Sequence, residues 1–110
     1  MSSDILNGAA MQPLPRAGDI HHETVGTSST AAIDLFDVLG VSSNQTRVRV
    51  SVECSAQAYI VSGDSSVVAA TTSHKRLAAN SPRFYFVAHS RRWVRLIADA
   101  AATDVEFTLG

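Results

Sequence analysis

The sequence predicts an all-β domain, an antiparallel β-sandwich or jelly roll of about seven to eight strands with an extended N-terminal arm. From residue 20 onward, short apolar runs are separated by turn residues, which is typical of many short strands. Several runs alternate apolar and polar side chains, as half-buried strands do. No run of ten or more residues shows a sustained helical period with caps, so the crossover helices of a parallel sheet are missing.

Size and composition limit the chain to one domain. Its 110 residues leave no room for a second core, and 45% hydrophobic with 17% charged residues is typical of a folded globular protein. Nine Lys and Arg against ten Asp and Glu give a net charge of -1, so we expect neither nucleic acid nor an anionic membrane as a partner. No apolar run approaches the roughly 20 residues of a membrane helix, and the start lacks the features of a signal peptide, so we expect a soluble protein.

Residues 1–18 are predicted to form the arm, and residues 19–110 the sandwich. The arm contains Pro13 and Pro15 and has no sustained hydrophobic period. An extended segment of this kind can lie along a neighbouring subunit, although it is also what a disordered terminus looks like.

The first two predicted strands are weakly marked. Residues 20–25 are expected to be a strand. Residues 31–36 are also predicted as a strand, with one or two turns of helix within 31–39 as the alternative.

The clearest strand is 46–54, in which every second residue is apolar: Val48, Val50, Val52 and Cys54. Four further runs are rich in β-branched and aromatic residues and are predicted strands: 56–61, 66–70, 83–88 and 92–98. The last strand, 104–109, alternates again. Hairpins are predicted at Gly63-Asp64-Ser65 and at residues 100–103, the latter joining the last two strands.

No pattern in the sequence predicts an enzyme, a cofactor or a metal site. His21-His22-Glu23 is the most metal-like string, but adjacent side chains of a strand point to opposite faces. Gly63-Asp64-Ser65 resembles the start of a Gly-Asp-Ser-Leu hydrolase motif, but a strand-like run follows it instead of a helix, so a turn is expected. His74 and His89 stand alone and are expected in exposed loops. Cys54 is the only cysteine, so we expect a small buried hydrophobe and no disulfide.

The strand that contains Arg91, Arg92, Trp93 and Arg95 is the best candidate contact surface, together with Pro13 and Pro15 of the arm. Val94, Leu96 and Ala98 are expected on one face of this strand, and Trp93, Arg95 and Ile97 on the other. Apolar residues on both faces fit a core on one side and a subunit neighbour on the other. Plain packing, or contact with nucleic acid or a glycan, remains open.

The second half of the chain shows an ordered series of features. These are Tyr59 to Val67, Ala69 to Ser73, Leu77 to Pro82, the aromatic strand Phe84 to Val87, Trp93 to Ala98, and Val105 to Gly110. From Ala58 to Gly110 the chain thereby resembles small proteins encoded among the structural genes of tailed bacteriophages.

The resemblance implies a small β-sandwich virion component, in particular a capsid decoration or cement protein that binds and stabilises the head shell. It further implies the major capsid protein or other virion proteins as partners, a homo-oligomer (often a trimer), no active site, and a place on the capsid surface after a soluble stage in the host cytoplasm. A neck, tail or fibre component is the first alternative. A carbohydrate-binding or receptor-binding module, with Trp93, Tyr59 and Tyr85 as aromatic platforms, is the second.

Overall fold

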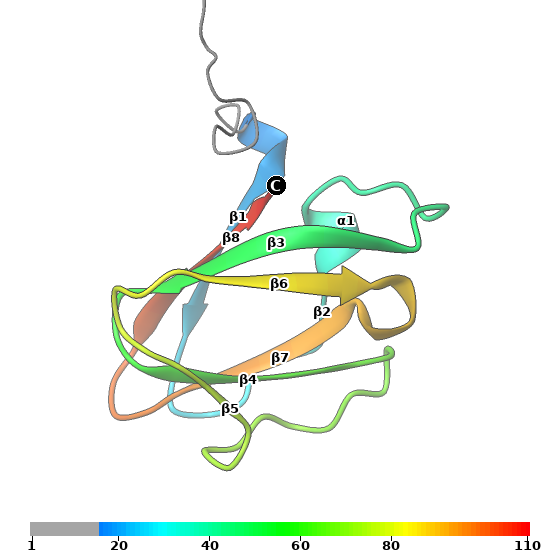
Figure 1. Ribbon diagram of the computed structural model, residues 1–110. Coiled ribbons are helices and arrows are strands. Elements are labelled where there is room, and N and C mark those ends of the chain that lie inside the picture. Colours follow the sequence, from blue (N-terminus) through cyan, green and yellow to red (C-terminus); the bar gives the residue numbers. More distant parts are fainter. Residues whose placement is uncertain (1–15) are drawn as a thin grey trace, which may run out of the picture.

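The computed structural model describes residues 16–110, which form eight strands and three short helical turns (Figure 1). In chain order these are η1 (Ala17–Asp19), β1 (Ile20–Val25), β2 (Ile33–Asp34), α1 (Leu35–Val38), β3 (Arg47–Cys54), β4 (Ala58–Gly63), β5 (Lys75–Leu77), β6 (Arg83–Ala88), η2 (His89–Arg91), β7 (Trp93–Ala98) and β8 (Thr103–Leu109).

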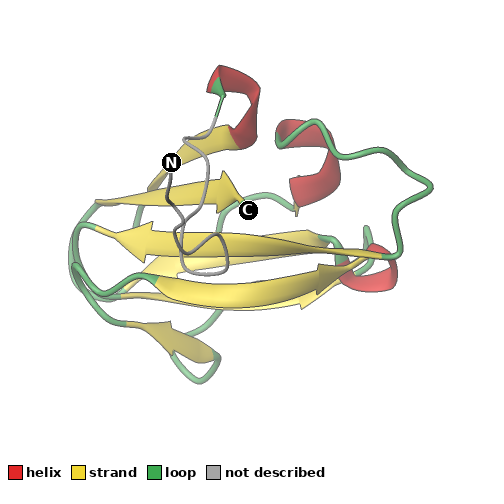
Figure 2. Ribbon diagram, turned by 45° about the horizontal axis from the view of Figure 1, so that its top comes forward, coloured by secondary structure: helices red, strands yellow, loops and turns green. Residues whose placement is uncertain are grey.

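The strands form two four-stranded sheets, with the orders β1-β8-β3-β6 and β2-β7-β4-β5 (Figures 1 and 2). Every strand pair in both sheets is antiparallel. The pairs β1-β8, β2-β7, β3-β6 and β4-β5 join the first four strands to the last four in reverse order. This is the arrangement of a long hairpin rolled up on itself, so the predicted sandwich is confirmed and its topology is that of a jelly roll.

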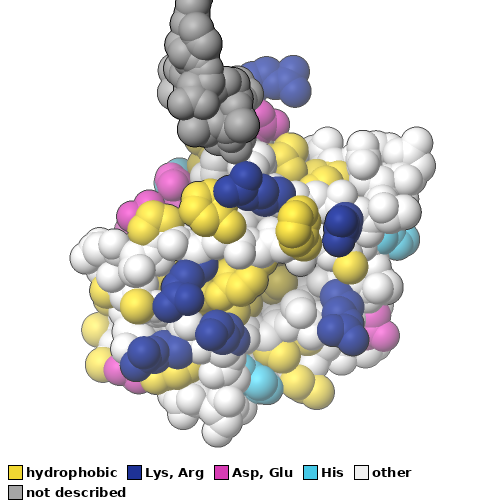
Figure 3. Space-filling view, viewed as in Figure 1, with side chains coloured by type: hydrophobic (Ala, Val, Ile, Leu, Met, Phe, Trp, Pro, Cys, Tyr) yellow, Lys and Arg dark blue, Asp and Glu magenta, His cyan; other side chains and the backbone are white. Residues whose placement is uncertain are grey.

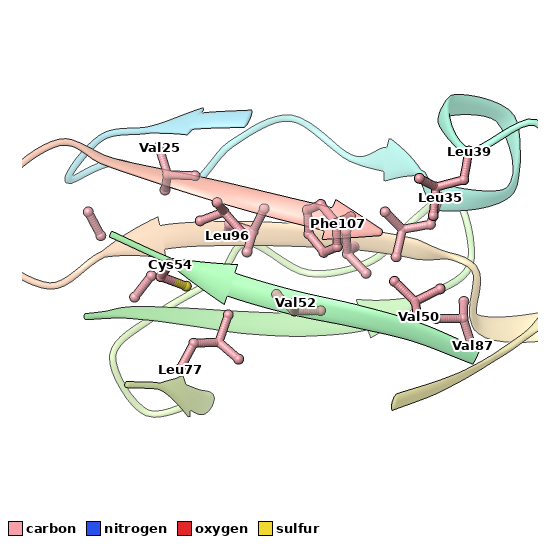
Figure 4. Packing of buried hydrophobic residues seen from close by; sticks show 14 of the residues in the cluster. Val25, Leu35, Leu39, Val50, Val52, Cys54, Leu77, Val87, Leu96 and Phe107 are labelled. Carbon is pink, nitrogen blue, oxygen red and sulfur yellow. The ribbon is translucent and has the colours of Figure 1, made fainter. Parts of the chain in front are cut away.

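The core lies between the two sheets and is built from their alternating inward side chains (Figure 4). Phe107 of β8 is fully buried at its centre, and Leu96 of β7 is fully buried opposite. Cys54, at the end of β3, is only 2% exposed, which confirms the prediction of a small buried hydrophobe. Burial of these side chains is the main source of stability in such a fold.

Residues 31–36 do not form one continuous strand as predicted. Only Ile33 and Asp34 pair, with β7, and the chain then turns into α1. Asp34 causes the change because its side chain accepts hydrogen bonds from the backbone N–H groups of Phe36 (3.1 Å) and Asp37 (3.5 Å) and so caps the helix. The helical alternative for this segment is therefore correct for residues 35–38.

The prediction of a strand at 66–70 is wrong. This segment is part of the connection 64–74, in which Val67 and Ala70 are buried and Val68 between them is exposed. Two buried residues three positions apart do not fit the period of two of a strand. The antiparallel partner of β4 is instead β5, which has one buried apolar residue, Leu77, and so gave little signal.

The second predicted hairpin is also wrong. Strands β7 and β8 are consecutive in the chain but belong to different sheets, so residues 99–102 cross the end of the sandwich. Leu96 and Phe107 lie on inner faces in either arrangement, and alternation alone does not distinguish a hairpin from a crossing.

Within residues 16–110, none of the helices has the length and apolar character needed to span a bilayer.

Candidate functional site: an exposed arginine–phenylalanine ladder

The most unusual surface feature lies on the outer face of the first sheet, where arginines of β3 stack on phenylalanines of β6. Arg49 pairs with Phe86 in the register of the two strands, and Ser51 pairs with Phe84. The guanidinium carbon of Arg47 lies 4.6 Å from the centre of the Phe86 ring, and that of Arg49 lies 4.6 Å from the centre of the Phe84 ring. We call these four residues the Arg–Phe ladder.

The two rings of the ladder face solvent. Phe84 is 58% exposed and Phe86 is 67% exposed; Val68, at 62%, is the other large hydrophobic residue left open among residues 16–110. Strand β6 is the last strand of its sheet, so its outer backbone edge is also unpaired within the described part of the chain. On the same side of the molecule, Lys and Arg side chains alternate with hydrophobic ones (Figure 3).

Alternation along the two strands explains this surface. Arg47 and Arg49 occupy the polar face of β3, as the sequence predicts, because Val50 and Val52 point into the core. In β6, Tyr85 and Val87 take the inner face and leave the phenylalanines outside. The signal was present in the run Phe84 to Val87, since four consecutive apolar residues in a strand must put apolar side chains on both faces.

The predicted contact strand has a different environment. Val94, Leu96 and Ala98 are buried and Trp93 is partly buried, so the predicted alternation of β7 is confirmed. Arg91 is exposed in η2. Arg92 is held within the chain: its Nε lies 3.1 Å from Oδ1 of Asp34.

Arg95 is also engaged internally. Its Nε donates to the Thr30 carbonyl oxygen (2.8 Å), and its Nη1 donates to that of Val67 (3.3 Å). These bonds tie two connections to β7: 26–32, whose backbone also pairs along the edge of the strand, and 64–74. The use of Arg91, Arg92, Trp93 and Arg95 as an interface stays a prediction, and Pro13 and Pro15 lie outside the described residues.

The suggested aromatic platforms differ from the rings that the fold exposes. The Tyr59 hydroxyl donates to Oδ1 of Asp99 (3.0 Å) and accepts from Nε2 of Gln57 (2.9 Å). Tyr85 points to the inner side of β6, and Trp93 is only partly exposed. Phe84 and Phe86, which sequence reasoning did not single out, are the rings available to a partner.

The histidines do not come together. His21 lies on the inner side of β1, where its Nε2 is 2.9 Å from Oε1 of Glu23 and its ring stacks on Phe107 with 6.5 Å between centres. His22 faces outward, with its Nε2 3.4 Å from Oε2 of Glu106. Within the described residues, no three His, Cys, Asp or Glu side chains gather closely enough to hold a metal ion.

The two remaining single histidines also have local partners. His74 Nδ1 accepts a hydrogen bond from the Thr71 N–H at 2.9 Å. His89 is exposed as predicted, but it lies in η2 and packs edge-on against Phe36, with 5.7 Å between ring centres.

A turn lies close to the predicted place, from Asp64 to Val67, directly after β4 ends at Gly63. The hairpin predicted at Gly63-Asp64-Ser65 is wrong, because β4 pairs with β5 across the connection 64–74. The Asp64 carbonyl oxygen accepts from the Val67 N–H (3.0 Å), and its Oδ1 accepts from the Ser66 N–H (2.8 Å). A Cβ at position 63 would lie 3.2 Å from the Val67 side chain, which is a tight contact, so glycine leaves room for Val67 to pack there.

Comparison of the chain with protein-family models, with curated proteins and with solved structures found no match.

Proposed function

We propose that this protein is a non-catalytic docking module that attaches to a protein surface through the Arg–Phe ladder. We further propose that it is a virion structural protein, in the first place a capsid decoration (cement) protein. The docking proposal rests on the exposure of Phe84 and Phe86, which are 58% and 67% exposed. Neighbouring exposed rings on one strand more often mark an interaction surface than a surface that stays in contact with solvent.

The chemistry of the ladder suits a protein partner. Phenylalanine and arginine are both enriched at protein interfaces, and covering a Phe side chain contributes about 1.5–3 kcal/mol. The stacking of Arg47 and Arg49 holds their guanidinium groups in place before binding, so less side-chain entropy is lost. A partner surface with apolar pockets and carboxylates would match both halves of the ladder.

The virion setting rests on the resemblance of residues 58–110 to phage structural proteins. A jelly roll occurs in viral capsid proteins but also in lectins, so the fold is compatible with a virion protein but does not distinguish it from a sugar-binding protein. A cement protein would occupy many equivalent places on a shell, and a symmetric oligomer, with a trimer as the first expectation, would present several ladders at once.

The test is to express the protein with a small tag from the phage genome that encodes it, purify the particles on a density gradient, and count copies per particle by quantitative mass spectrometry. A cement protein is expected in many copies per shell. The variant Phe84→Ser/Phe86→Ser is expected to fold and to lose at least tenfold in occupancy. The matched control, Val68→Ser, removes an equally exposed apolar side chain from another place and is expected to keep full occupancy.

Each part of the proposal has its own contrary result. Absence of the protein from particles would overturn the virion setting, and a few copies per particle would indicate a neck, tail or fibre component. Normal occupancy of the double variant would overturn the role of the ladder. Retention of the isolated protein on a glycan or single-stranded DNA column, lost in the same variant, would assign the rings to stacking on sugars or bases.

A further inference from the structure

A cavity of about 310 Å³ opens between the two sheets, beside the edge strand β6. It is visible as a hollow with a hydrophobic floor and Lys and Arg side chains at its sides (Figure 3). Apolar side chains from both sheets and from α1 line it: Leu35, Val52, Ile60, Val87, Val94 and Phe107. The volume is at the lower end of the range of small-molecule sites and corresponds to about ten water molecules at roughly 30 Å³ each.

The cavity has few polar lining residues: the hydroxyl residues Ser62 and Tyr85 and two charged residues, both of them cations. Lys75 and Arg91 line it, and none of its lining residues is acidic. Lys75 is placed there by the period of β5: it pairs with Ile60, one of the apolar lining residues, and shares its face with the buried Leu77. The neighbouring cation, Arg76, pairs with Tyr59 on the opposite face.

Tyr85 adds a group without a partner. It lines the same cavity, and its hydroxyl oxygen is buried with no hydrogen-bond partner among residues 16–110. Leaving a buried hydroxyl unpaired is unfavourable for folding, and such groups are rare in native proteins. The hydroxyl is closed off from solvent, so a bound molecule with a hydrogen-bond acceptor removes this cost only when the Tyr85 side chain turns toward the cavity.

We propose that the cavity binds a small organic carboxylate with a compact hydrocarbon body. The hydrocarbon lies against the apolar side chains between the sheets, and the carboxylate meets Lys75 and Arg91 at the mouth and accepts a hydrogen bond from the Tyr85 hydroxyl. An organic cation is disfavoured as the ligand because the charged lining residues, Lys75 and Arg91, are both positive. A long-chain lipid is too large for the volume of the cavity. Phe86 lines the cavity and also belongs to the Arg–Phe ladder, so the two surfaces adjoin, whereas Lys75, Arg91 and Tyr85 are not part of the ladder.

The probe is sodium octanoate, titrated into the full-length protein and followed by calorimetry and by shifts of backbone amide NMR signals. Saturable binding at one site is expected, with shifts concentrated at Val52, Val94 and Phe107. Octylammonium, with the same chain and the opposite charge, is expected to bind at least tenfold more weakly.

Three variants locate the site. Lys75→Met and Arg91→Met are each expected to weaken octanoate binding three- to tenfold, whereas Arg76→Met, a neighbouring cation on the other face, leaves it unchanged. Tyr85→Phe removes only the unpaired hydroxyl; it is expected to weaken binding about threefold while the melting temperature of the free protein stays the same or rises.

The proposal would be overturned if octanoate and octylammonium bound equally, or if Lys75→Met and Arg76→Met weakened octanoate binding equally. It would also be overturned if no saturable binding were seen up to 10 mM octanoate, which corresponds to a binding free energy of about -3 kcal/mol. These results do not bear on attachment to particles, because Lys75, Arg91 and Tyr85 are not part of the ladder. Phe86 belongs to both surfaces, so Phe84→Ser/Phe86→Ser is not used to test octanoate binding.

Discussion

At the scale of single residues, some polar side chains that the sequence suggested for binding instead stabilise the fold. Arg95 is the clearest case, because both of its hydrogen bonds end on backbone carbonyl oxygens of connecting segments. An arginine close to a tryptophan in the sequence can bind a partner or form hydrogen bonds within the fold. Only the position of the two connections shows that Arg95 does the second. Arg91, four residues away, remains exposed.

We expect Arg95→Met to lower the free energy of unfolding by about 1–3 kcal/mol, because two carbonyl groups lose a charged donor. Urea denaturation followed by the fluorescence of Trp93, the only tryptophan, measures the change. Arg76→Met is the control, since Arg76 is exposed, and it is expected to stay within about 0.5 kcal/mol of the wild type. Equal stability of the two variants would contradict a structural role for Arg95.

Cys54 provides a second prediction at this scale. Burial in the core, with a smaller contribution from the charge of Glu53, raises the pKa of the Cys54 thiol from 9.0 to about 11. The unfolded chain therefore loses this proton at lower pH than the folded protein does, and the thiol lowers stability as the pH rises from about 9 to about 11.

The free energy of unfolding is expected to fall by a few kcal/mol more in the wild type than in Cys54→Ala over this pH interval, although the variant starts from a lower value because it leaves a cavity. Urea titrations at pH 8, 9, 10 and 11 give both curves. Parallel curves would show that the thiol is not shielded. Shielding also predicts that a thiol reagent at pH 8 labels the native protein far more slowly than the unfolded one.

At the scale of elements, the junction of β2 and α1 depends on Asp34. Its carboxylate caps the helix and, from the same oxygen, contacts Nε of Arg92. The guanidinium of Arg92 also lies 5.8 Å from the centre of the Phe36 ring. One side chain thus ends a strand, begins a helix and connects both to the start of β7.

We expect Asp34→Ala to destabilise the protein by about 1–2 kcal/mol, and Asp34→Asn to do so by less, because asparagine also caps a helix but lacks the charge that pairs with Arg92. A double-mutant cycle of Asp34→Asn with Arg92→Met isolates the ion pair. A coupling energy near zero would mean that capping alone gives Asp34 its effect.

At the scale of the whole molecule, the jelly roll pairs segments that are far apart in the chain. Strand β1 pairs with β8, and Ile20 lies opposite Thr108. Such pairs form only after long loops close, so folding is expected to be slow, with a relaxation in the range of milliseconds to seconds. Stopped-flow refolding from urea with Trp93 fluorescence measures it, and a main phase faster than a millisecond would contradict the expectation.

The architecture also explains why the two candidate surfaces lie where they do. The outer face of the second sheet is partly covered by connections held by Arg95, whereas the outer face of β3 and β6 has no such cover among the described residues. The edge beside β6 is where the sandwich opens into the cavity. Both proposed activities therefore belong to one side of the molecule.

The sequence by itself determined the all-β class, most of the strands, the inner faces of β3 and β8, and the division of the β7 residues between two faces. These follow from alternation, which needs only neighbouring residues. It also determined that a turn lies near Asp64 and that Cys54 is buried, because both follow from the chemistry of the local residues.

Only the tertiary structure decided which sheet each strand joins, which outer face stays open and which arginines are already engaged. Residues 100–103 would look the same in a hairpin and in a crossing, and the apolar run of β6 does not say which of its faces is the inner one. The Arg–Phe ladder and the cavity beside Tyr85 bring together residues from separate strands, so their existence depends on pairing over long distances, which a local pattern does not contain.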